Sequence, residues 1–438
     1  MMTDQIDTEN RAIGAASPAL FATLAPLGRR VSFPPDIPFQ AAAARGKTYN
    51  GTIGQITDGA GSPLPLEPMA AAVAGLEPRD SDRFFLYSPV DGLPELRQRW
   101  REWQRRSVSP EAPSTLPLVT VGLTHGLSVV ADLFGGVGRK LVVPAPFWGN
   151  YRQTFAVRTG AEILSAPAYL DGRYNCRVIP EALAGVAPGE PAVAIVNLPS
   201  NPGGYAVTDS ERAELIAGLL EEADRRPLVV ICDDAYAGLV YEPDVSVRSL
   251  FWDLSGAHEQ LVPIKVDGAT KELSFFGGRV GFITFPFDPE SDVAQALESK
   301  VKCLTRSALG SPVAASQMIV LQALRDERIE ERVEQVRRVL EKRYRTLRKA
   351  LEEVAREAPE LLRPLPFNAG CFALLELAES LDADAVRRHL LEDHDTGLVS
   401  IGSSHLRIAF CSVKRAALPE LVQRVTRAAR EMAVAAKG

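Results

Sequence analysis

Short apolar runs dominate the middle of the chain, and each ends in turn-forming or polar residues. Most of them are apolar on both faces of an extended chain, and amphipathic helical stretches lie in several of the intervals. Strands buried on both faces and alternating with helices are typical of a mostly parallel sheet covered on two sides, so the pattern predicts an α/β fold. From Leu118 onward the runs are LVTVG, KLVVPAP, PAVAIVNLP, PLVVICDDAY and LVPIKVDGATK.

The pattern changes after about residue 320. The segment RDERIEERVEQVRRVLEKRYRTLRKALEEVAREA predicts one long helix whose opposite charges often lie three or four residues apart. The run NAGCFALLEL, a helical stretch from about Asp382 and the run HLRIAF then predict a smaller α+β domain built from both chain ends. We expect an irregular arm at 1–45, a first part of the small domain at 46–85, a large domain at 86–319 and the rest of the small domain at 320–438.

Composition narrows the class of protein. The chain has 438 residues and a formal net charge of −6, so it lacks the basic footprint of a nucleic-acid partner. No apolar stretch is long enough to span a membrane, and the N-terminus MMTDQIDTEN does not resemble a signal peptide, so we expect a cytoplasmic protein. The five cysteines form no C-x-x-C pair and the five histidines no H-E-x-x-H pattern, so we expect reduced thiols and no metal site.

The chemically interesting residues follow the predicted strands. In parallel sheets, ligands bind outside the carboxyl ends of the strands. Lys271 follows one strand in GATKELSFFGGRVGF, with Arg279 eight residues later. Two further motifs, SNPGG at 200–204 and DDAYAGLVY at 233–241, each end a strand of their own. A lysine at a strand end is usually only solvated, so the combination carries more weight than any single motif.

Taken in order, these motifs resemble a known series. GLTHGL, PFWGNY, NPGG, DDAY, ATK with GGRVG, and HLRIAF are similar to the motifs of class I/II aminotransferases, which are fold-type I pyridoxal phosphate (PLP) enzymes. The likeness runs from about Tyr49 to Arg407, and WGNY at 148–151 with YNGTIGQITDGAGSPLPL at 49–66 favours the aspartate and aromatic branch. It implies PLP as cofactor, a seven-stranded large domain and a homodimer with shared active sites.

The resemblance assigns the chemistry to four residues. Lys271 would carry PLP as a Schiff base and, once displaced by substrate, move a proton between the substrate Cα and the cofactor C4′. Asp233, or failing that its neighbour Asp234, would pair with the pyridine nitrogen and keep it protonated. Asn201 and Tyr236 would donate hydrogen bonds to the phenolic O3′.

Other positions would hold the ring and the phosphate. Trp148 would stack on the cofactor ring, and Tyr87 would reach the phosphate held by the partner subunit. The phosphate itself would be bound at a helix start and by nearby side chains. The residues implied for this are Leu123, Thr124, Thr270 and Arg279.

Two positions depart from the family pattern. Gly268 stands three residues before the lysine, where the family usually has a serine whose hydroxyl touches the phosphate. One phosphate contact is therefore expected to be lost or replaced. The phosphate loop reads GLTHG, which leaves His125 with a structural role.

Substrate recognition follows from the same resemblance. Arg407 would clamp the α-carboxylate of an amino acid with its planar guanidinium, beside Gly54, Trp148 and Asn201. Arg306 stands four residues before GSP, much as the arginine that reads a second carboxylate does in aspartate aminotransferases, and would come from the partner subunit. Amino acids and 2-oxo acids, with acidic or aromatic side chains favoured, would then exchange an amino group by a ping-pong mechanism.

Two alternatives remain open from sequence. A C–S β-lyase or a related lyase shares most of these residues, and product analysis distinguishes it from an aminotransferase. A non-catalytic sensor module of the same fold would need a DNA-binding segment. The residues before Tyr87 show no helix-turn-helix pattern.

Overall fold

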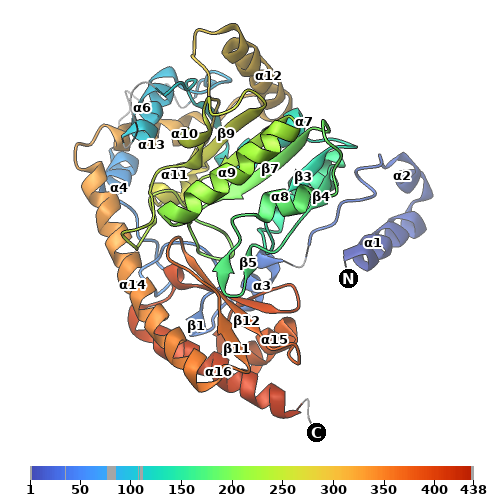
Figure 1. Ribbon diagram of the computed structural model, residues 1–438, viewed down its shortest axis with the longest axis vertical. Coiled ribbons are helices and arrows are strands. Elements are labelled where there is room, and N and C mark those ends of the chain that lie inside the picture. The colour runs from blue at the N-terminus through green and yellow to red at the C-terminus, as the bar shows by residue number, and fades with distance from the viewer. Residues whose placement is uncertain (1, 35, 76–84, 107, 109–111, 436–438) are drawn as a thin grey trace.

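The computed structural model describes residues 2–34, 36–75, 85–106, 108 and 112–435. Figure 1 shows a large domain above, a smaller domain below and an N-terminal arm that projects to the right. Among the described helices, none is both long and apolar enough to cross a membrane.

A seven-stranded sheet forms the centre of the large domain, in the order β2-β10-β9-β8-β7-β3-β4. All neighbouring strands are parallel except β10, which is antiparallel to both β2 and β9. The predicted α/β class is therefore confirmed. The strands are β2 Leu118–Thr120, β3 Lys140–Val142, β4 Glu162–Leu164, β7 Ala192–Asn197, β8 Leu228–Asp233, β9 Leu261–Gly268 and β10 Gly281–Thr284.

Alternate residues of these strands enter two different cores. Ile195 and Ile231 pack with α7 and α14, whereas Val196 and Cys232 pack with α8, α9 and α10. Because successive side chains of a strand point to opposite faces, both faces of the sheet are covered. The helices named are α7 Gly122–Phe134, α8 Val178–Leu183, α9 Asp209–Arg225, α10 Leu250–Leu254 and α14 Ile329–Glu357.

The small domain is a four-stranded antiparallel sheet, in the order β11-β12-β15-β14, that packs against helices of the C-terminal part. A separate two-stranded pair joins β1 to β13, which brings residues 49–50 into this domain (Figure 1). The elements are β1 Tyr49–Asn50, β11 Leu362–Pro364, β12 Phe372–Leu377, α15 Ala383–Asp393, β13 Thr396–Gly397, β14 Val399–Ile401, β15 His405–Ala409, 3₁₀ turns η3 Phe410–Ser412 and η4 Arg415–Ala417, and α16 Leu418–Ala435.

The N-terminal arm differs from the irregular chain that we expected at 1–45. It contains helices α1 Met2–Ala16 and α2 Pro18–Thr23, which pack on each other, and α3 Ile37–Ala43, which contacts β13 and β14. Ser17 caps α2 by accepting a hydrogen bond from the Leu20 amide, and Pro18 occupies the first turn. These local signals for a helix outweigh the lack of a steady apolar period.

Helix α4 Glu67–Ala74 also differs from the expected division, in which 46–85 belongs to the small domain. Its Met69 and Ala72 share an apolar cluster with Trp100 of α6 and Val320 of α13. This helix thus packs on the outer helices of the large domain. The remaining elements are α6 Pro94–Arg105, π-helical turn η1 Arg152–Val157, β5 Tyr169–Leu170, β6 Arg173–Tyr174, α11 Ala269–Glu272, 3₁₀ turn η2 Phe276–Gly278, α12 Asp292–Leu309 and α13 Ala314–Leu324.

Candidate active site

Three predicted motifs meet at the carboxyl edge of the large sheet. Asn197, the last residue of β7, is paired in register with Asp233, the last residue of β8. The Asn197 side-chain amide donates to the Asp233 carbonyl at 2.9 Å, and its oxygen accepts from the Asn201 amide at 2.8 Å. Lys271 lies on the short helix α11, which begins directly after β9.

Asp233 is a buried carboxylate with a defined partner. The Tyr151 hydroxyl donates to its Oδ2 at 2.5 Å, and the Ala235 amide donates to its Oδ1 at 3.1 Å. Burial raises the pKa of Asp233, and the hydrogen bond from Tyr151 opposes that rise. Sequence analysis missed Tyr151, because it assigned a functional role to Trp148 alone within the WGNY motif.

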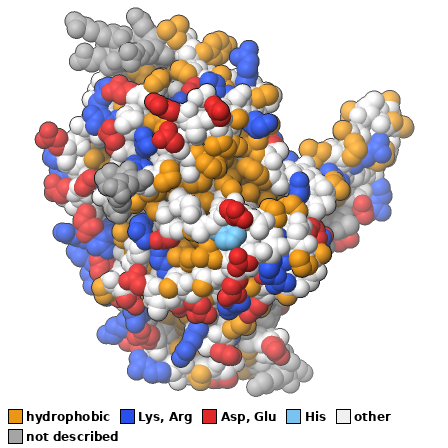
Figure 2. Space-filling model, turned by 45° about the horizontal axis from the view of Figure 1, so that its top comes forward, with side chains coloured by type: hydrophobic (Ala, Val, Ile, Leu, Met, Phe, Trp, Pro, Cys, Tyr) orange, Lys and Arg blue, Asp and Glu red, His pale blue; other side chains and the backbone are white. Residues whose placement is uncertain are grey.

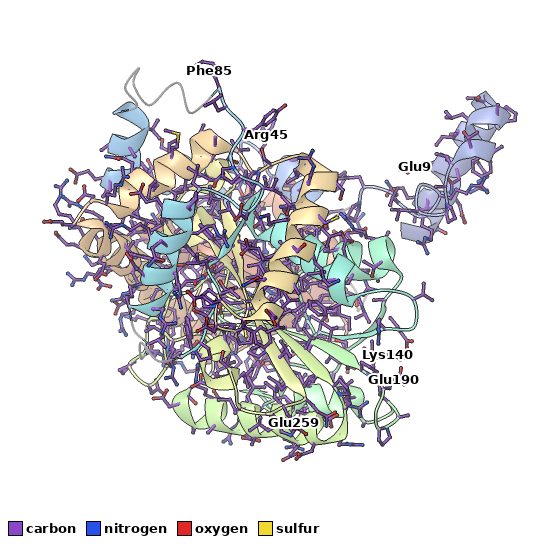
Figure 3. All side chains as sticks on the ribbon, turned by 90° about the horizontal axis from the view of Figure 1, so that it is seen from above. Glu9, Arg45, Phe85, Lys140, Glu190 and Glu259 are labelled. Atoms are coloured by element: carbon purple, nitrogen blue, oxygen red, sulfur yellow. The ribbon has the colours of Figure 1, made fainter. Side chains whose placement is uncertain are left out.

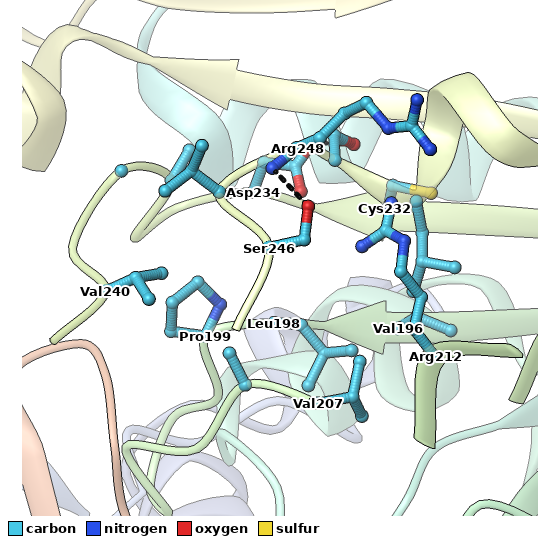
Figure 4. Close-up of a pocket in the computed structure, with 16 residues that line it drawn as sticks. Val196, Leu198, Pro199, Val207, Arg212, Cys232, Asp234, Val240, Ser246 and Arg248 are labelled. Carbon is cyan, nitrogen blue, oxygen red and sulfur yellow. Dashed lines mark hydrogen bonds between the residues drawn. The ribbon is translucent and has the colours of Figure 1, made fainter. Parts of the chain in front are cut away.

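Asp234 faces the opposite side of the sheet. It accepts from Ser249 at 2.7 Å and pairs with the buried ammonium of Lys265. It also lines a cavity of about 30 Å³ together with Cys232 and Arg212, shown in Figure 4. Because Cys232 belongs to the core on the α9 side, this cavity is separated from Asp233 by the sheet. The geometry therefore favours Asp233 over Asp234 as the residue that faces a cofactor.

Lys271 lies beside Tyr236 and Asp233. Its Nζ is 5.2 Å from the centroid of the Tyr236 ring. Loss of solvation lowers the pKa of Lys271, and the charge of Asp233 opposes that shift. A larger fraction of this amine is therefore neutral than for a lysine in water. A neutral amine is what attack on a carbonyl carbon requires.

An anion cradle lies at the N-terminus of α7. The Arg279 guanidinium packs so closely on Gly122 that a Cβ at Gly122 would lie 2.4 Å from its Nη2. Thr124, in the first turn of the helix, is exposed, and Leu123 is buried behind it. The Thr270 hydroxyl is buried and, among the described residues, has no hydrogen-bond partner. Free helix N–H groups, a guanidinium and an unused hydroxyl together fit a phosphate.

Gly268 occupies a position with no room for a side chain. A Cβ there would lie 2.5 Å from the Val280 carbonyl oxygen and 2.8 Å from Gly281 Cα. The usual serine would therefore collide with the neighbouring strand β10. His125 acts locally, because its Nδ1 accepts the Val121 amide at 3.1 Å at the start of α7.

Arg407 links the small domain to the large one. Its Nη1 donates to Asn201 Oδ1 at 2.9 Å, and its Nη2 donates to the Thr52 carbonyl at 2.7 Å. Its Nε is buried without a partner among the described residues. Burial lowers the pKa of Arg407 to about 10, which leaves it a cation at neutral pH. A buried cation with an unused N–H is suited to a carboxylate ligand.

Phe372 is a second residue that the sequence did not single out. The Arg407 guanidinium lies 4.3 Å from the centroid of its ring, and the Tyr236 ring lies edge-on to it at 5.5 Å. A Cβ at Gly54 would lie 2.4 Å from Phe372 Cζ, so only glycine lets the residue 49–66 segment approach this ring.

Trp148, predicted to stack on a cofactor, lies edge-on to Tyr151 at 5.5 Å.

Two predicted site residues lie apart from this cluster. Tyr87 is 95% exposed, and Arg306, near the end of α12, is also exposed. Within the part of the chain that the structure describes, the Arg306 side chain has no hydrogen-bond or ion-pair partner. Figure 3 shows Phe85, two residues before Tyr87, projecting outward from the molecule. Neither Tyr87 nor Arg306 completes the site within one chain.

A buried ionic cluster supports the site from behind. Lys265 of β9 pairs with Asp234 and, at 3.3 Å, with Asp267. The Trp100 and Gln104 side chains donate to Asp267 at 3.0 and 2.9 Å. These charges lie next in sequence to Asp233 and Gly268, so the cluster fixes the strand ends that present the site. In the sequence, the only sign of this ionic cluster was that single charged residues interrupt the apolar runs.

A lysine amine beside a buried aspartate, at the strand ends of such a sheet and next to an anion cradle, is the arrangement that the resemblance to fold-type I PLP enzymes implies. A family model described as aminotransferase class I and II matches residues 52–425. The chain belongs to this family, and its cofactor is PLP.

Relatives agree with this assignment. The chain is 29% identical over 377 residues to the 2-aminoadipate transaminase of Thermus thermophilus, covering 83% of this chain and 86% of that one. It is also 29% identical to an aspartate aminotransferase of Pyrococcus abyssi, over 61% of this chain and 64% of that relative. The latter match thus spans less than two thirds of the relative's length.

Solved structures share the fold. The α-aminoadipate aminotransferase of Thermus thermophilus, in complex with N-(5′-phosphopyridoxyl)-L-leucine, has a TM-score of 0.77 and is 25% identical, covering 95% of this chain and all of that one. An aminotransferase of Anaerococcus prevotii has a TM-score of 0.79 at 19% identity, covering 93% of this chain and 99% of that one. At that identity, the second likeness supports the fold alone.

Proposed function

We propose that the protein transfers an amino group between an L-amino acid and a 2-oxo acid in two half-reactions at one site, a ping-pong scheme. The proposal rests above all on Arg407, which reaches Asn201 across the two domains and lies near Tyr236, the residue whose ring Lys271 faces. A carboxylate clamp next to an amine of lowered pKa suits α-amino acid chemistry.

The residues of the large domain would hold the cofactor. Lys271 would bind it covalently through Nζ, Asp233 would pair with the ring nitrogen, and Asn201 and Tyr236 would donate to the phenolic oxygen. The α7 N-terminus with Leu123, Thr124, Thr270 and Arg279 would hold the phosphate. When bound, PLP supplies an electron sink for the bond broken at the substrate Cα.

Lys271 would then act as the proton carrier. Once freed by the incoming amino acid, its neutral amine would accept a proton from the substrate Cα and would deliver it to the cofactor C4′. The lowered pKa of Lys271 favours the accepting form, and the nearby Asp233 charge steadies the protonated form. Tyr236 and Trp148 would limit the movement of the amine and the ring.

Arg407 would bind the substrate α-carboxylate, and the backbone of Gly54 would contact the same end of the substrate. Part of this binding is prepared in advance, because Asn201 and Thr52 already fix two of the guanidinium nitrogens. A pre-oriented guanidinium loses less conformational entropy when substrate binds. This clamp fits any α-amino acid, so it does not select a side chain.

For the side chain we propose acidic or aromatic substrates, read by Arg306 of a second subunit. The support is the position of Arg306 before GSP and its lack of a partner within the described chain. Relatives named for aspartate, 2-aminoadipate and aromatic amino acids accord with this range. Aspartate and 2-aminoadipate each carry a second carboxylate, for which a free guanidinium is a suitable partner.

We also propose a homodimer with shared sites. Phe85, Leu86 and Tyr87 are 86%, 67% and 95% exposed, which is unusual for three consecutive large apolar side chains. Figure 2 shows hydrophobic side chains gathered in the centre of one face. A partner covering Tyr87 would place its hydroxyl at the other subunit's phosphate. Light scattering of the purified protein should give twice the chain mass, and a strict monomer would contradict this part.

Product analysis tests the reaction type. With an amino acid donor and 2-oxoglutarate, the account predicts the donor's 2-oxo acid and glutamate in equal amounts. Pyruvate and ammonia, formed without an acceptor, would favour a C–S β-lyase instead.

All five cysteines are free, as in a reducing compartment, so we propose a cytoplasmic location, which cell fractionation would check.

A further inference from the structure

Two histidines and a glutamate meet where α15 and α16 pack together in the small domain. His389 Nε2 lies 2.7 Å from Glu431 Oε2, and His394 Nε2 lies 2.8 Å from the same oxygen. The three ligand atoms all lie within 4.8 Å of one another. His394 is almost buried, whereas His389 and Glu431 remain open to solvent.

The protons in this cluster are tightly constrained. His389 Nδ1 also lies 2.8 Å from Asp393 Oδ2, so this ring faces a carboxylate at both nitrogens. A neutral imidazole carries only one N–H, so it can donate to only one of the two carboxylates. When the His389 Nδ1–H donates to Asp393, the lone pair of its Nε2 faces the ligand atoms of Glu431 and His394.

We propose that His389, His394 and Glu431 form a site for a divalent metal ion of the Zn²⁺ class. Two imidazole nitrogens and one carboxylate oxygen are a ligand set that zinc uses when a fourth position stays open to water. The solvent-facing side supplies that position. Asp393 would hold the His389 ring by its Nδ1–H, as an outer carboxylate does for many metal-bound histidines.

The surrounding contacts hold His394 in place. The Thr396 hydroxyl and Arg424 Nη1 donate to the His394 carbonyl at 2.7 and 2.6 Å. Arg424 in turn lies over the Tyr49 ring at 4.3 Å. Metal binding would therefore cross-link α15 to α16 next to the β1–β13 pair, away from the residues assigned to the cofactor. The linear sequence hides this set, because Glu431 is far from both histidines in the chain.

Titration calorimetry with ZnCl₂ alone, on the cofactor-loaded protein, tests the proposal. His394→Asn removes one ligand, and His258→Asn is a matched control, because the His258 ring contacts a single carboxylate, that of Asp224, and accepts the Gln260 amide, away from this cluster. We expect wild type and His258→Asn to bind one more equivalent of Zn²⁺ than His394→Asn, and only these two to gain thermal stability from it. Equal binding by all three proteins would mean that the cluster is an ion pair only and would overturn the proposal.

A second variant keeps the test independent of folding. Asp393→Asn leaves all three ligands in place but removes the outer carboxylate from the largely exposed edge of the cluster. We expect it to weaken Zn²⁺ binding about 10- to 100-fold. Unchanged affinity, together with zinc binding that survives Glu431→Gln, would also contradict the assignment.

Discussion

The floor and the rim of the site differ in how much one chain completes. The floor, which we define as Lys271, Asp233, Tyr151, Asn201 and Arg407, is buried or half-buried, and its members are linked by hydrogen bonds or close charges. The rim, which we define as Tyr87 and Arg306, is exposed. On the proposed function, proton transfer at the substrate Cα would need the floor of a single chain, whereas Tyr87 and Arg306 would act only in an assembly.

The largest expected effect is at the centre of the floor. Lys271→Ala should fold normally yet lose turnover, because proton transfer alone contributes on the order of 10²–10⁴-fold. Steady-state assays and thermal melts should be compared with Lys349→Ala, which alters an exposed lysine of α14. Retained activity in Lys271→Ala would refute the role of this lysine.

The ionic support behind the floor should matter mainly for stability. Lys265→Met leaves Asp234 and Asp267 as unpaired buried charges, which typically costs about 3–5 kcal/mol of unfolding free energy. Lys140→Met breaks an exposed lysine–glutamate pair and should leave that free energy almost unchanged. Urea unfolding of both variants is the measurement. An equal loss of unfolding free energy in the two variants would contradict the supporting role of the buried ionic cluster.

Tyr151→Phe should change the pH profile more than the fold. The Tyr151 hydroxyl opposes the burial that raises the pKa of Asp233, so its removal raises that pKa further. Activity needs the ionised carboxylate, and the acid limb of kcat/KM should therefore move to higher pH by about one unit. An acid limb that stays in place, or moves to lower pH, would contradict the pairing of these two residues.

Substitutions in the rim should cause smaller losses of kcat/KM, and these losses should depend on the substrate. Arg306→Gln should lower kcat/KM about tenfold for aspartate or glutamate and leave phenylalanine almost unaffected. Arg338→Gln, on an exposed face of α14, is the matched control. Equal losses for acidic and aromatic donors would demote Arg306 to a structural residue.

The smallest effect is expected at Tyr87. Tyr87→Phe removes one hydroxyl from the phosphate of the neighbouring subunit, which should weaken cofactor binding by about 0.5–1.5 kcal/mol. Equilibrium dialysis of PLP measures this loss directly. A loss that persists in a protein shown to be monomeric would argue against a contact between subunits.

The sequence was most informative where strand ends carry motifs. The apolar runs indicated the sheet, and the order of the motifs predicted from sequence alone that Lys271, Asp233 and Arg407 belong to one site. Prediction from the sequence failed where the role of a residue depends on packing. Tyr151 and Phe372, for example, look like ordinary core aromatics. The helices of the arm were missed because residues 1–45 show no steady apolar period. The reason for glycine at position 268 became clear only from its contact with strand β10.

The visible spectrum of the purified protein tests the central claim most directly. The account predicts an absorption band from lysine-bound PLP that aspartate or glutamate removes and 2-oxoglutarate restores. A response to neutral or aromatic donors alone would keep the enzyme class and demote Arg306. No band, even after incubation with PLP, would contradict the assignment of Lys271 and its site.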